Sequence, residues 1–252
     1  MKSQALICFL SFLWAIEGVA LYNGTPALPD MPEDNLFLKE DSWFSLKTGG
    51  QVDWLVSRRV QVSSGQSPHM HSFLKGGEIS FGFINKVELY TFLGAQNMAL
   101  KAYKQGEFFS LKTTNSFGGE VGARATAIFW GETRLGFDAK YFYSWPQIES
   151  LVVEGVSRSV KTSTTWEQEW QVGVALSQRF AFFSPYIGVK YARMSLHFMG
   201  LSSLGGDIEV KNASPFGAFL GIGVAGQKGV FFDAEASFFD DYLFSGALGI
   251  RF

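Results

Sequence analysis

Residues 242–252 read YLFSGALGIRF, and this stretch decides the fold. Side chains of an extended strand point alternately to two faces, so every second residue shares an environment. One face carries Tyr242, Phe244, Gly246, Leu248, Ile250 and Phe252, and the other carries Leu243, Ser245, Ala247, Gly249 and Arg251. An alternating strand that ends on an aromatic residue is typical of the closing strand of a bacterial outer-membrane barrel. Closing the sheet leaves no unpaired backbone groups facing lipid.

The composition is that of one large domain and excludes some partners. The 252 residues are 47% hydrophobic, which is ample for a single domain. The 21 basic and 23 acidic residues are too evenly balanced to indicate nucleic-acid binding. The 26 Phe and 28 Gly residues suit a fold with bulky lipid-facing groups and tight bends. A soluble β-sandwich could have the same composition, so the targeting signal decides between the two.

Residues 1–20 have the pattern of a secretory signal peptide. Lys2 is followed by an apolar run over 6–16 and by Gly18-Val19-Ala20, whose small side chains suit a cleavage site. We expect cleavage after Ala20, which would also remove Cys8, the only cysteine. No later stretch approaches the about 20 apolar residues of a spanning helix. We therefore expect either a periplasmic protein or an outer-membrane barrel.

Residues 21–41 are expected to form an irregular periplasmic lead-in, folded against the barrel or into its pore, because three prolines interrupt any periodicity. Residues 42–252 alternate, and predict an all-β, transmembrane antiparallel β-barrel of about 12 strands, within a range of 10–16. The predicted strands are 43–56, 78–93, 98–103, 107–113, 120–130, 133–145, 148–156, 165–180, 186–198, 216–226, 230–238 and 242–252. An even number returns the chain to the periplasmic side.

Aromatic girdles mark both ends of such barrels, so the tryptophans test this segmentation. The predicted strands place Trp43 and Trp145 at periplasmic ends, and Trp130 and Trp166 at outer ends. The polar stretch 63–71 is expected to be an external loop.

Several motifs resemble those of the chlamydial major outer membrane porins. They are FINKVELYTFLGA at 83–95, EWQ at 169–171, ALS at 175–177, SPYIGVK at 184–190, NGTPALP at 23–29 and VGAR at 121–124. The resemblance implies a barrel with a pore. Members of that family are typically longer, cysteine-rich and cross-linked by disulfides. Because the predicted mature chain has no cysteine, the cross-linked structural role is not expected here.

Charged residues oppose the apolar face in most predicted strands, which makes them candidates for lining a pore. They are Lys47, Asp53, Glu120, Arg124, Arg134, Asp138, Lys140, Glu167, Glu169, Asp233, Glu235 and Arg251. Seven are acidic and five are basic, so no ion selectivity is predicted. The alternative is an interior plugged by mutually paired charges, as in narrow barrels. About twelve strands would leave a wider lumen, which favours a pore.

The residues with catalytic or metal-binding chemistry are few. His69 and His71 are two residues apart in the predicted loop, but a metal site needs three or four ligands and only His197 remains. Ser195 and His197 share a strand face without implying an activated nucleophile. We therefore predict no enzymatic activity, no metal and no cofactor.

The predicted function is that of an outer-membrane porin allowing passive diffusion of small hydrophilic solutes. The alternative is a non-conducting surface barrel with an adhesive or envelope-structural role. Predicted partners are outer-membrane lipid, the solutes, and the barrel-assembly machinery, with a homo-oligomer also compatible. The assembly signal is expected to comprise Tyr242, Phe244, Leu248, Ile250 and Phe252.

Overall fold

The computed structural model describes residues 21–25, 43–62, 68–84, 86–104, 106–160, 163–201, 204–226 and 229–252. The predicted signal peptide and most of the predicted lead-in lie outside these ranges. Within them, no helix has the length and apolarity needed to cross a bilayer.

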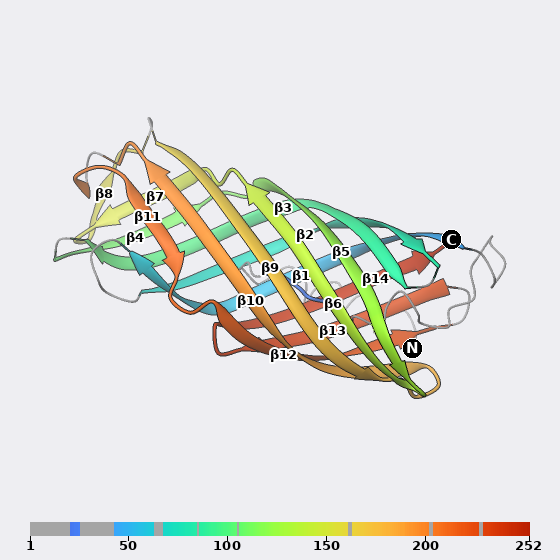
Figure 1. Cartoon of the computed structure of the whole chain (residues 1–252). Helices are drawn as coiled ribbons and strands as arrows, with labels where there is room; N and C mark the ends of the chain where they lie inside the picture. The colour runs from blue at the N-terminus through green and yellow to red at the C-terminus, as the bar shows by residue number, and fades with distance from the viewer. Residues whose placement is uncertain are drawn as a thin grey trace, which may run out of the picture.

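The described residues form fourteen strands, all paired antiparallel. They are β1 (Phe44–Val62), β2 (His69–Phe83), β3 (Val87–Lys104), β4 (Glu107–Thr113), β5 (Ser116–Trp130), β6 (Thr133–Ser144), β7 (Ile148–Val153), β8 (Val156–Arg158), β9 (Thr164–Gln178), β10 (Phe183–Met199), β11 (Ile208–Asn212), β12 (Phe216–Ala225), β13 (Val230–Phe238) and β14 (Asp241–Arg251). Ten of them close a ring in the order β1-β14-β13-β12-β10-β9-β6-β5-β3-β2-β1 (Figure 1). The predicted all-β barrel is confirmed, and about 12 strands was close to the fourteen observed.

The closing strand β14 seals the ring against β1. Their register runs from Lys47 opposite Arg251 to Leu55 opposite Leu243. The backbone amide of Phe252 donates to the carbonyl of Leu46 at 2.7 Å, which continues the pairing to the last residue. The outward apolar face predicted for this strand is exposed, and the opposite face is turned into the barrel.

The two ends of the barrel differ. At one end, short connections over 84–86, 131–132, 179–182 and 226–229 join neighbouring ring strands, and we call this the short-turn end. At the other, the extended end, β4, β7 and β8 prolong the sheet from β3, and β11 bridges β10 and β1 (Figure 1). In outer-membrane barrels the short turns are periplasmic and the longer connections are external.

The wall of the barrel is uneven in height. β1 and β10 have 19 and 17 residues, whereas β13 and β14 have 9 and 11. β11 spans the gap that the shorter strands leave, because it pairs with β10 on one side and β1 on the other. The extended end is therefore closed by a different set of strands from the ring.

Three sequence predictions about the strands are wrong. The single strand predicted over 78–93 is a hairpin of β2 and β3, which turns after Phe83, where Ile84 adopts a left-handed φ of 54°. The strand predicted over 148–156 does not cross the barrel, because β7 and β8 pair with each other at the extended end. His69 and His71 are in β2 rather than in a loop.

The strands predicted over 107–113 and 120–130 also do not reverse direction, because β4 and β5 both pair antiparallel with β3 and so run the same way. Counting them as two successive crossings reversed the direction assigned to β5 and β6. Trp130 therefore shares the short-turn end with Trp43, and Trp145 shares the extended end with Trp166, contrary to the prediction that paired Trp43 with Trp145. The strand predicted over 148–156 was a second error of one crossing. It cancelled the first error, so the direction predicted for β9 is correct.

Candidate functional site

The structure places all twelve predicted pore-lining side chains inside the barrel, each at most 7% exposed. They project from β1, β5, β6, β9, β13 and β14, because the alternation of each strand turns them away from its apolar face. We call the part of the interior that holds them the charged lumen. Their role in conduction stays a prediction.

One ion-pair network in the charged lumen is centred on Glu88, which the sequence analysis did not select. Lys47 Nζ lies 3.0 Å from Glu88 Oε2, and Arg124 Nη1 lies 3.2 Å from Glu88 Oε1. Arg124 Nε also lies 3.4 Å from Asp138 Oδ2, and Lys140 Nζ lies 3.9 Å from Asp138 Oδ1. Charges of both signs therefore neutralise each other across β1, β3, β5 and β6.

A second network lies closer to the extended end. Arg58 donates to Glu169 at 2.6 Å and 3.2 Å and to Asp241 at 2.9 Å. Lys190 donates to both oxygens of Asp241 and lies 3.4 Å from Asp240. All five side chains are almost fully buried, so each charge depends on its partners for solvation.

Alternation alone could not have placed Arg58 in the lumen. Counting from Phe44 turns Arg58 outward with Trp54 and the other lipid-facing residues. The register of β1 shifts between Leu55 and Ser57, and such a bulge reverses the facing of every later residue. Glu88, in contrast, alternates with outward Val87 and Leu89, so the period-two pattern did contain the signal for it.

A short segment of chain, residues 21–25, lies inside the charged lumen and is fully buried or nearly so. The backbone N and the side-chain Nδ2 of Asn23 donate to Glu235 Oε1 at 3.1 Å and 2.9 Å. Arg124 Nη2 donates to the carbonyl oxygen of Asn23 at 3.1 Å, and Gln171 Nε2 donates to its Oδ1 at 2.6 Å. The wall of the barrel thus supplies most of the hydrogen bonds that a buried peptide needs.

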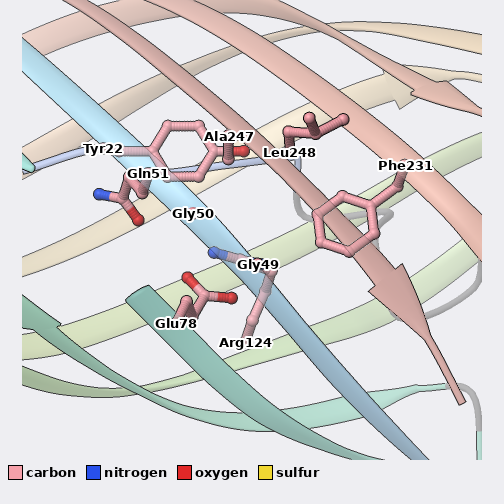
Figure 2. Close-up of a pocket in the computed structure, with 9 residues that line it drawn as sticks. All are labelled: Tyr22, Gly49, Gly50, Gln51, Glu78, Arg124, Phe231, Ala247 and Leu248. Carbon is pink, nitrogen blue, oxygen red and sulfur yellow. The ribbon is translucent and has the colours of Figure 1, made fainter. Parts of the chain in front are cut away.

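A small cavity lies beside this segment. Figure 2 shows Tyr22, Gln51, Glu78 and Arg124 around a cavity of about 10 Å³, roughly the space of one water molecule. Around this cavity, paired side chains and residues 21–25 occupy the charged lumen.

Glycines allow aromatic rings to lie flat against the inner wall. A Cβ at Gly122 would come within 2.3 Å of the ring of Tyr90, its neighbour across β3 and β5. Tyr186 covers Gly221 across β10 and β12 in the same way. The hydroxyl of Tyr90 then donates to Asp138 Oδ2 at 2.8 Å. These contacts bring aromatic side chains into the ionic network without leaving their hydroxyl groups unpaired.

The interior changes character at the extended end, where a cluster of buried apolar side chains replaces the charges. We call this cluster the extended-end core. It comprises Leu55, Val60, Val62, Met70, Met98, Leu100, Ala102, Phe109, Leu111, Leu151, Val153, Met194, Leu196, Phe198, Leu201, Leu204, Ile208, Val210 and Leu243. The sequence analysis did not predict it.

At the boundary between the charged lumen and the extended-end core, the apolar residues of a strand change from its outward face to its inward face. In β10, Ile187 and Val189 point outward and Lys190 points inward, whereas further along Met194 and Leu196 point inward. β3 reverses in the same way between Leu93 and Leu100. The first pattern is that of a strand between lipid and a polar interior, and the second is that of a soluble protein. The reversal marks where the strands leave the membrane.

Ser195 and His197 do come together on the outer surface of β10, with Glu209 of β11 beside them. Ser195 Oγ lies 3.0 Å and Glu209 Oε1 lies 3.5 Å from the same atom, His197 Nε2. A catalytic triad needs the carboxylate on the other ring nitrogen, so this arrangement is not one. Lys211 donates a hydrogen bond to Glu209, which lowers the pKa of that carboxyl.

The remaining histidines make local contacts. Ser57 Oγ lies 2.8 Å from His69 Nδ1, and a ring nitrogen of His71 contacts the carbonyl of Val56. The described residues contain no group of three or more His, Cys, Asp or Glu side chains arranged to hold a metal.

Comparison with known proteins tests the family resemblance suggested by the sequence motifs. The family model described as the Chlamydia major outer membrane protein matches residues 152–201, which run from β7 through β10. The chain is similar to the chlamydial major outer membrane porins. The resemblance read from the sequence is thereby confirmed, and its EWQ, ALS and SPYIGVK motifs all lie within the matched residues.

Two relatives show the extent of the similarity. The major outer membrane porin, serovar L3, of Chlamydia trachomatis is 29% identical in an alignment that covers 49% of this chain and 38% of that protein. The major outer membrane porin of Chlamydia pneumoniae is 27% identical in an alignment that covers 70% of this chain and 52% of that protein. The chain thus spans about half the length or less of these curated relatives.

Among solved structures, the chain is similar to the β domain of the Bordetella autotransporter BrkA, at 11% identity and a TM-score of 0.45, covering 83% of this chain and 98% of that one. It is also similar to the outer membrane protein OprG from Pseudomonas aeruginosa, at 8% identity and a TM-score of 0.37, covering 83% and 95%.

Proposed function

We propose that this outer-membrane barrel is a porin that passes small hydrophilic solutes by passive diffusion. The observation that carries the proposal is the charged lumen, a ring of buried charges inside a ten-stranded wall with an apolar outer face. The relatives named as porins support it. We propose that the protein acts as a passage and not as an enzyme.

Residues 21–25 and the extended-end core both occupy the interior in this conformation, and we propose that conduction requires two changes. Residues 21–25, held by hydrogen bonds to Asn23, must leave the charged lumen. The extended-end core must also part, because its apolar side chains pack across the path to the outside. We therefore propose a porin with rare or small openings.

A second candidate is a non-conducting barrel with a structural role in the envelope. The extended-end core favours it, because nineteen buried apolar side chains form a packed interior of the kind that stabilises soluble domains. This candidate predicts a protein that inserts and folds but carries no current.

Planar-bilayer recording of the folded protein separates the two functions. A porin gives discrete conductance steps, and Asp53→Asn changes their ion preference because it removes one buried lumen charge. A structural barrel gives no steps, even after Leu196→Ser has loosened the extended-end core. Heat-modifiable gel mobility, measured on the same samples, shows that each protein has folded.

The remaining proposals concern export and assembly. We propose that the signal peptide is removed after Ala20. We also propose that the barrel-assembly machinery recognises β14 through Tyr242, Phe244, Leu248, Ile250 and Phe252. Mass spectrometry of the mature N-terminus tests the first, and insertion of β14 variants tests the second.

A further inference from the structure

The outer surface of the barrel has a pocket at the point where β10 changes partner. β10 pairs with β12 as far as Tyr191 and with β11 from Ser195 onward. We call this point, between Tyr191 and Ser195, the fork. Asn212 bridges it, because its Nδ2 donates to the carbonyl of Ala192 at 2.8 Å and its Oδ1 accepts from the amide of Met194 at 3.2 Å. The backbone around the pocket is therefore fixed by hydrogen bonds.

The pocket is polar, basic and of useful size. Its volume is about 420 Å³, and its lining includes Gln61, Gln168, Trp170, Arg193, Ser195 and Lys211. Arg193 stands in the middle of the fork, is exposed, and has no ion-pair partner among the described residues. Lys211 is paired with Glu209 at 2.9 Å, so the uncompensated charge of the pocket is that of Arg193.

The position of the pocket relative to the membrane indicates what it binds. It lies where the apolar residues of β10 change from the outward to the inward face, which is the level of lipid headgroups. On one side of it, Trp170 and Tyr191 pack at 5.2 Å between ring centroids, and Val172 and Val189 continue an exposed apolar surface toward the membrane. Aromatic belts of this kind belong at a membrane interface.

We propose that this pocket binds the phosphorylated saccharide headgroup of an outer-leaflet glycolipid. The planar guanidinium of Arg193 suits a phosphate, which it can hold with two parallel hydrogen bonds. Gln61, Gln168 and Ser195 offer donors and acceptors to sugar hydroxyls, and the face of Trp170 offers an apolar surface to a sugar ring. The acyl chains lie along Val172 and Val189. The inference needs only the barrel in its membrane and does not depend on conduction.

Native mass spectrometry of the detergent-folded protein tests the proposal, with bisphosphorylated lipid A as the probe. We expect the parent to bind lipid A at least fivefold more tightly than the dephosphorylated lipid. Arg193→Gln should lower the affinity for lipid A roughly tenfold, because a charge-assisted, bidentate contact is lost. Arg193→Lys should lose less, because it keeps the charge without the planar fork.

The control is Arg179→Gln, which changes a half-buried arginine paired with Glu132 at the short-turn end and should keep the parent affinity. Arg193 is exposed, so its variants should fold, and heat-modifiable mobility checks that they do. Equal affinity of Arg193→Gln and the parent overturns the proposal. Competition by soluble glucosamine 1-phosphate at the same concentration as lipid A also overturns it, since the pocket would then be a site for a free phosphosugar.

Discussion

The two halves of the barrel interior are filled by opposite means. The charged lumen is held by ion pairs such as Arg58 with Glu169, and the extended-end core is held by apolar packing around residues such as Phe198. Buried ion pairs lose in desolvation much of what they gain by attraction, whereas a buried apolar side chain stabilises by about 1.5–3 kcal/mol. The stability of the protein should therefore reside mainly in the extended end, which leaves the charged lumen free to exchange its contacts.

The largest effect is expected in the extended-end core. Phe198→Ala should lower the free energy of unfolding by about 4 kcal/mol, because it leaves a cavity around a fully buried ring. Urea unfolding of vesicle-inserted protein measures the loss. Phe182→Ala, at an exposed phenylalanine of the short-turn end, is the control and should cost less than about 1 kcal/mol. Equal losses in the two variants would show that the core is not the stabilising region.

A smaller effect is expected in the charged lumen, and it should be reversible. Arg58→Met leaves Glu169 and Asp241 without their shared partner and should cost about 3 kcal/mol. Adding Glu169→Gln should restore most of the loss, because Asp241 stays paired with Lys190 and Glu169 is the carboxylate left stranded. If the double variant stays as unstable as Arg58→Met, the network contributes net stability and the contrast between the halves is wrong.

The closing strand should affect insertion more than stability. Phe252→Ser removes an aromatic anchor of about 2 kcal/mol and should slow insertion, because pairing with β1 reaches this residue. Arg251→Ala changes the inward face of the same strand and should insert normally, altering at most conductance. Heat-modifiable gel mobility reports both. Normal insertion of Phe252→Ser, or failure of Arg251→Ala, would contradict the assigned facing.

The smallest effect is expected where residues 21–25 meet the wall. Asn23→Ala removes the side-chain bonds to Glu235 and Gln171 but keeps the backbone ones, and should cost about 1 kcal/mol. Under the proposed porin function it should raise the frequency of conductance steps. Asn97→Ala removes a bond to Asn115 outside the lumen and should leave the steps unchanged. An unchanged frequency in Asn23→Ala would show that this segment does not limit conduction.

The contrast between the halves also explains which features the sequence could predict. Alternation with charges on one face located the twelve inward residues, because lipid on the other side permits only apolar side chains. The same rule failed for Arg58, since a bulge cannot be seen in a pattern of period two. It also missed the extended-end core, although Leu100 and Ala102 alternate with Lys101. The alternation of inward apolar and outward charged residues there indicates a core only if this part of β3 lies outside the membrane, in water.

The uneven wall has a consequence for the surface of the cell. β1 is ten residues longer than β13 (19 against 9), which corresponds to a projection of roughly 25 Å for a tilted strand. What extends from the membrane is therefore largely hydrogen-bonded sheet around its own apolar core. Antibodies raised against the folded protein should recognise conformational epitopes there, and short peptides from β10 or β11 should compete poorly for them.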